Sequence, residues 1–111
     1  MNSPHYSRSY GEIHTRIVSF CRDLVLVSNT VSGKTYRSRW YGWQNIGELP
    51  AKTKTEGNVQ THRRTVTASC DFGSWYRYRT EGFGTVSTGS QTFSASAYEQ
   101  NDSAIYCGSN P

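Results

Sequence analysis

Large aliphatic side chains are scarce in this chain of 111 residues, which holds three Leu, four Ile and one Met. A helical bundle needs Leu, Ala, Glu and Lys in quantity, so this composition argues against an all-helical fold. No apolar run approaches the roughly 18 residues that a transmembrane helix requires. The three Cys form no CxxC pair, and the three His lie at no zinc-like spacing from them. The sequence therefore predicts no membrane span, no metal site and no cofactor.

Strong charge of one sign is also missing. The chain carries 12 Lys and Arg against 8 Asp and Glu, which gives a net charge of +4. This excess lies in residues 1–47, which hold six basic and two acidic side chains, while residues 48–111 hold six of each. A nucleic-acid-binding protein is usually more basic, with its charges more clustered. We therefore expect nucleic acid not to be the partner.

Aromatic and β-branched residues are abundant instead, with 8 Tyr, 4 Phe, 3 Trp, 7 Val and 12 Thr. These side chains fit the pleated, half-buried surface of a β-sheet. A disordered chain is poor in both kinds of residue, so disorder is excluded as well. The length suits one domain.

Short segments of alternating polarity, separated by turn residues, continue along the chain. We expect strands at 12–21, 24–28, 34–43, 59–70, 74–81, 85–87, 91–98 and 103–107. The stretch 44–58 is expected to be a loop, and Gly82 and Gly84 to mark a bulge or a bend. The prediction is all-β: one small antiparallel β-sandwich or barrel-like domain over residues 12–111, with seven to eight short strands. Residues 1–11 show no periodicity and are expected to form a flexible N-terminal arm.

The cysteines favour an exported protein with a disulfide, because polar β-rich chains with a few scattered Cys are typical of secreted proteins. We predict a Cys70–Cys107 bridge, since both residues end a predicted strand, and leave Cys21 unpaired. In the chain-entropy model this bridge contributes about 3–4 kcal/mol. The alternative is three reduced cysteines packed as small hydrophobic residues. The N-terminus has no signal peptide, so an exported protein would be represented here by its mature form.

No catalytic motif is present. There is no GxSxG sequence, and none of the three His has a catalytic motif around it. Glu48 and Glu56 share the expected 44–58 loop, where nothing fixes the separation that a glycosidase needs. The sequence therefore predicts a protein that is not an enzyme.

Two predicted strands combine aromatic residues with Arg, the residue types enriched at interface hot spots. They are 34–43, with the sequence YRSRWYGW at 36–43, and 74–81, with WYRYR at 75–79. One face of each strand is needed for the core, and we assign Trp40 to it. The other face predicts an exposed surface that binds protein or carbohydrate.

Several segments together suggest a family: YGEIHTRIVSFC (10–21), YRSRWYGWQ (36–44), TASCDFGSWYRYRTEG (67–82) and AIYC (104–107). Over most of residues 4–107 this pattern resembles small secreted β-rich proteins of actinobacteria. Some of these are similar to the adaptor subunit of the Streptomyces umbrella toxin particles, which are antibacterial. The resemblance implies a non-enzymatic adaptor that links a lectin-like subunit to the large toxin subunit.

On this hypothesis the N-terminal arm and the folded body each contact a partner protein. We expect the arm contact to use Tyr6, Arg8 and Tyr10, and the body contact to use Arg37, Arg39, Tyr41 and Trp43. Two alternatives stay open. One is a carbohydrate-binding module with exposed Trp and Tyr as sugar platforms, and the other is a small secreted inhibitor or toxin that acts on an envelope target.

Overall fold

The computed structural model describes residues 1–108, and every regular element in that range is a β-strand. The nine strands are β1 (His5–Ser7), β2 (Glu12–Phe20), β3 (Ser28–Arg39), β4 (Gly42–Lys54), β5 (Thr61–Ser69), β6 (Trp75–Tyr76), β7 (Tyr78–Ser87), β8 (Thr92–Gln100) and β9 (Ile105–Tyr106). All pairings are antiparallel, so the predicted all-β antiparallel fold is confirmed. In the same range no helix is long and apolar enough to span a membrane.

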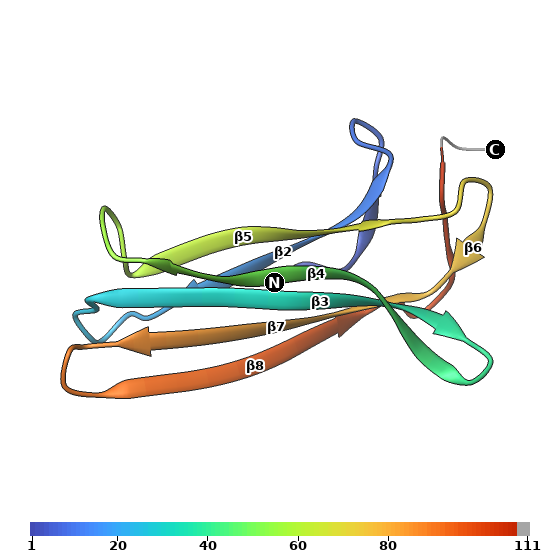
Figure 1. The fold of residues 1–111 in the computed structure, drawn as a ribbon. Helices are drawn as coiled ribbons and strands as arrows, with labels where there is room; N and C mark the ends of the chain where they lie inside the picture. Colours follow the sequence, from blue (N-terminus) through green and yellow to red (C-terminus); the bar gives the residue numbers. More distant parts are fainter. Residues whose placement is uncertain (109–111) are drawn as a thin grey trace.

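The strands form two stacked layers and a small third sheet (Figure 1). One layer has the strand order β1-β2-β5, and the other has the order β4-β3-β7-β8. The third sheet pairs β6 with β9 and lies at one end of the elongated molecule, which measures 50 × 30 × 20 Å. The two-layer arrangement is the sandwich that the sequence predicts.

The core between the layers consists of two small apolar clusters. One contains Ile13, Ala68 and Tyr78, and the other contains Ile17, Val31 and Val66. Three fully buried threonines are also part of this interior, and the hydroxyls of Thr15 and Thr35 each lie 2.8 Å from the hydroxyl of Thr80. Because these hydroxyls satisfy one another, they can be buried without leaving a polar group unpaired. These three buried threonines explain how a chain with so few Leu and Ile fills its core.

Glycines let the two layers approach closely. Gly33 of β3 pairs with Gly82 of β7, and the side chain of Ile17 from β2 packs over both. The predicted bulge at Gly82 and Gly84 is therefore wrong: both residues continue the regular pairing of β7 with β3 and with β8. Their lack of a side chain makes room for Ile17 and Ser19 of the facing strand.

The expected 44–58 loop is also wrong, because most of it belongs to the 13-residue strand β4. This strand is the edge of its sheet and pairs with β3 through two register shifts. An edge strand tolerates Pro50 and exposed Lys residues, which makes it read like a loop in the sequence. Glu48 consequently lies within β4, while Glu56 lies in the turn that follows it.

Two further segments differ from expectation. Residues 24–28 were predicted as a buried strand, but Leu26 alone is buried there, and residues 21–27 connect β2 to β3 as a bent loop. Residues 1–11, the predicted arm, lie against the sheet: β1 pairs with the start of β2, and Pro4 is buried. The alternation of His5, Tyr6 and Ser7 beside an open strand edge is enough to extend the sheet.

The close approach at Gly33 gives a direct test of the packing. A Cβ atom at this position would lie 2.5 Å from Ile17 Cδ1 and 2.9 Å from Val66 Cγ2. We expect Gly33→Ala to lower the free energy of unfolding by about 1–3 kcal/mol through overpacking. Ile17→Val removes the nearest methyl group, so the double variant should recover part of that loss. Urea unfolding of the four proteins measures the coupling, and purely additive effects would contradict the proposed contact.

Candidate binding surface

Five exposed aromatic side chains lie at the end of the molecule that carries β6 and β9. We call this region the aromatic end, and its exposed aromatic residues are Tyr10, Trp40, Tyr41, Phe72 and Trp75. They come from three separate turns and from β6, which meet here because β2 and β7 begin and β3 and β5 end at this side of the sandwich (Figure 1). Single exposed aromatics are ordinary, but their recurrence on several elements of one end makes this end the candidate interaction surface.

The hairpin between β3 and β4 projects the most exposed of these residues. Arg39 pairs with Gly42, so Trp40 and Tyr41 form the two-residue turn, and their rings meet edge to face at 5.4 Å. Gly42 adopts φ 130°, a left-handed conformation that favours glycine. Trp40 is 95% exposed, so its predicted place in the core is wrong. The alternation that assigned it there stops at the turn, where neither side chain faces the core.

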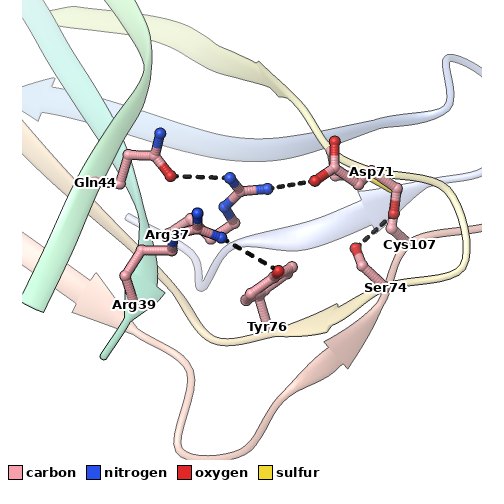
Figure 2. Close-up of polar contacts among 8 residues, drawn as sticks. Arg37, Arg39, Gln44, Asp71, Ser74, Tyr76 and Cys107 are labelled. Atoms are coloured by element: carbon pink, nitrogen blue, oxygen red, sulfur yellow. Dashed lines mark hydrogen bonds and ion pairs between the residues drawn. A yellow bond between two sulfur atoms is a disulfide. The ribbon is translucent and has the colours of Figure 1, made fainter. Parts of the chain in front are cut away.

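Arg37 fixes the base of this hairpin from inside. Its guanidinium donates to Asp71 Oδ2 at 2.7 Å and to Gln44 Oε1 at 2.8 Å, and it lies 4.7 Å from the centre of the Tyr76 ring (Figure 2). These contacts connect β3, β4, β6 and the turn after β5. Arg39 reaches the hydroxyl of Tyr76 at 3.4 Å. The charge of Arg37 is therefore engaged within the molecule, and this residue positions the surface instead of offering a free guanidinium to a partner.

A disulfide holds the opposite side of the aromatic end. Cys70 and Cys107 are bridged, with their Cα atoms 6.0 Å apart, as the sequence predicts, and Cys21 is free. Two backbone hydrogen bonds continue the link: Gly73 N–H donates to the Cys107 carbonyl at 2.7 Å, and Cys107 N–H donates to the Ser74 carbonyl at 2.9 Å. Together they attach β6 and β9 to the end of β5.

Two shallow hollows flank β6. The first measures about 360 Å³ and is lined by Ser38, Arg39, Trp40, Tyr76 and Arg77. The second measures about 420 Å³ and is lined by Tyr6, Arg8, Trp75, Ala104, Ile105, Tyr106 and Gly108. Each hollow combines arginine with aromatic rings, and Trp75 stacks on Tyr106 with ring centres 5.0 Å apart. Such hollows suit the insertion of a partner's side chain and its acidic groups.

The seven residues expected to bind a partner all lie at this end. Tyr6 packs against the core cluster of Ile13 and lines the second hollow beside Arg8, while Tyr10 is exposed on the turn between β1 and β2. In the hairpin, Arg39 and Tyr41 are exposed, Arg37 is engaged internally, and Trp43 is half-buried with Arg77 above its ring at 5.9 Å.

Sequence reasoning did not assign a partner contact to Trp40, Trp75 or Phe72. The local sequence does hold a signal for Trp40. The glycine that follows Trp40 and Tyr41, between two segments that can pair, favours a tight hairpin turn at these two residues.

Two of the histidines have close partners within the chain. His62 is buried, and its Nδ1 donates to the Asn29 carbonyl at 2.8 Å. His14 lies 3.5 Å from Glu12 and stacks near Tyr10. Within the described part of the chain, no three His, Cys, Asp or Glu side chains converge as metal ligands.

Comparison with known proteins adds no relative: no family model, no curated protein and no solved structure matches this chain.

The contacts of Arg37 predict unequal effects for the two sides of its ion pair. The Asp71 side chain is 73% exposed, and an exposed ion pair contributes about 0–1 kcal/mol. Asp71→Asn should therefore cost little. Arg37→Ala should cost more, about 1–3 kcal/mol, because Gln44 and Tyr76 also lose their partner. Thermal unfolding of both variants tests this ranking, and equal losses would show that the ion pair alone matters.

Tyr78 predicts a response to alkaline pH. Burial raises the pKa of its phenol, and among residues 1–108 its hydroxyl has no hydrogen-bond partner. The raised pKa means that the associated stability is complete below pH about 10, the ordinary tyrosine pKa, and is lost as pH rises through the folded-state pKa. Tyr78→Phe should match or exceed the wild-type stability at pH 7 and lose less above pH about 10. Parallel pH profiles for both proteins would contradict this assignment.

Proposed function

We propose that this chain is a non-enzymatic, secreted protein-binding module that docks through its aromatic end. The observation that carries the proposal is that exposed Trp40, Tyr41, Phe72 and Trp75 lie at one end of the molecule, where Trp40 and Trp75 each line a hollow together with arginine. Trp, Tyr and Arg are the side chains that dominate interface energies. Trp and Tyr bury a large area with only two side-chain torsions to fix.

The construction of this end also supports docking. Arg37 and the Cys70–Cys107 bridge hold its turns in place before any partner arrives. A preorganised surface loses less conformational entropy on binding than a mobile one. The arginines that line the two hollows, Arg8, Arg39 and Arg77, favour a partner with carboxylate groups opposite them.

Secretion is part of the proposal, and the disulfide supports it, because such bonds persist in oxidising compartments. The resemblance to umbrella toxin adaptors suggests the particular role of an adaptor between a lectin-like and a toxin subunit. A binding module of this kind needs a rigid, aromatic surface, and the exposed rings of the aromatic end support that part of the proposal.

Carbohydrate binding is the second candidate. Sugar platforms need aromatic ring faces that are free and aligned. Trp43 has the Arg77 guanidinium above its ring, and Trp75 packs against Tyr106 on the paired strand β9. These two rings are therefore occupied by neighbours, which favours protein docking over sugar stacking. A glycan array separates the two functions, since strong sugar binding would replace the protein-docking proposal.

The docking proposal is tested by capturing partners from the culture supernatant of the source organism on the immobilised chain. We expect Trp40→Ala to weaken capture of a specific protein by about 30-fold or more, the effect of removing an interface hot spot. Val25→Ala is the matched control, because Val25 is an equally exposed apolar residue in the loop between β2 and β3, at the opposite end of the sandwich. Equal capture by both variants would overturn the proposal.

A further inference from the structure

One strand of the sandwich has no facing strand in the opposite layer. Strand β8 forms the edge of its four-stranded sheet, and residues 92–98 are exposed on both faces. Its inner face carries Phe93, Ala95 and Ala97, which pair with Val86, Gly84 and Gly82 of β7. Between this face and the end of β2 lies a groove of about 280 Å³. Apart from Phe93, the side chains on its floor are small, and Met1, which packs against the Ile17 cluster, lines the same groove. Another strand would pack on this floor beside Met1.

The wall of the groove is an unpaired strand edge. β1 pairs with β2 only as far as His14, and Asn2 extends the contact to Arg16 through hydrogen bonds of 2.6 and 3.2 Å. In an antiparallel strand, alternate residues direct their backbone groups to the same side. Val18 and Phe20 therefore direct their N–H and C=O groups to the open side, where no strand of the described chain pairs with them.

The groove needs a particular kind of occupant. A strand paired to the edge of β2 and packed on β8 must place small apolar side chains inward and polar ones outward. β8 itself has this pattern, with Phe93, Ala95 and Ala97 alternating with Ser94 and Ser96. It also has a free edge, because half of its backbone groups point away from β7.

The side chains of the groove present no charge that would repel an identical partner. The chain carries a net charge of +4, which opposes self-association in general. None of the fourteen residues that line the groove has a charged side chain. Edge strands that avoid self-pairing usually carry an inward-pointing charge or a proline, and residues 92–98 contain neither.

We propose that the groove binds β8 of a second copy of this chain, giving a two-fold symmetric dimer. Each β8 would pair with the open edge of the other copy's β2 and pack its inner face on the other β8. β2 and β3 are consecutive and run in opposite directions, and β8 is parallel to β3 because each is antiparallel to β7. The incoming β8 is therefore antiparallel to β2, the orientation that continues this antiparallel sheet.

The symmetry has a consequence for binding. In the proposed dimer, the β2 layer of each copy continues into the β8 layer of the other copy. The two-fold axis that relates the copies must then run along the strands, so both copies point in the same direction. The two aromatic ends then lie at the same end of the dimer. This inference does not depend on the function proposed for the aromatic end, because it rests on β2, β7 and β8 alone.

Sedimentation velocity of the full chain from about 1 to 200 µM tests the dimer. We expect a species of twice the 12.5 kDa chain mass at the upper concentrations. Ala95→Arg places a charge on the inner face of β8 and should weaken the dimer by more than about 100-fold. Thr92→Arg is the matched control, since Thr92 lies on the outer face of the same strand, does not line the groove and should leave the dimer intact.

A wild-type chain that stays monomeric throughout would overturn the proposal and leave the groove to another occupant. Equal dissociation by both variants would overturn it as well. A second measurement needs no variant: amide hydrogen exchange at Val18 and Phe20 should slow as the chain concentration rises. Exchange that is independent of concentration at these two amides would contradict the pairing.

Discussion

The Cys70–Cys107 disulfide is the link on which the aromatic end depends. From residues 71–77 and 101–108, Tyr76 and Ile105 pack only at the margin of the Ile13 cluster, and neither segment supplies a buried member of the two apolar clusters, so burial alone holds these segments weakly. The bridge joins the end of β5 to the last strand, and the hydrogen bonds of Gly73 and Cys107 with their neighbours extend that join into β6. Arg37 then attaches β6 and the 71–74 turn to the hairpin of β3 and β4. The bridge, these hydrogen bonds and Arg37 therefore hold the backbone that carries the exposed aromatic rings.

The interior shows why the aromatic side chains are available for the surface. Thr15, Thr35 and Thr80 satisfy one another's hydroxyls in the core, and Gly33 and Gly82 let Ile17 reach across the interface between the layers. Threonine and glycine allow a thin sandwich whose core needs only one fully buried aromatic residue, Tyr78. Most of the Tyr, Trp and Phe residues are consequently left for faces and turns, where they are suited to recognition.

The sequence predicts the features that depend on local pattern. Alternation locates β2 and β5 to within a residue or two, and the strand-end positions of Cys70 and Cys107 indicate their bridge. Prediction from the sequence fails where the place of a residue in the tertiary structure decides its environment. The sequence of β4 resembles a loop because an edge strand tolerates proline and lysine. Trp40 is predicted in the core because the alternating pattern of the sequence runs on through the turn, where the strand itself has ended. The groove beside β8 has no local signal, since it arises from the register of β7 with β8 and from the point at which β1 begins.

The central claim is that the core of the sandwich is stable without the disulfide, whereas the aromatic end depends on the Cys70–Cys107 bridge for its order. Amide hydrogen exchange of the oxidised and the reduced full chain tests it most directly, because exchange reports local stability along the backbone. The account predicts that reduction speeds exchange in residues 71–76 and 104–107, while the amides of Val31 and Val66 in the sandwich core stay protected. A uniform loss of protection, or no change around β6 and β9, would contradict it.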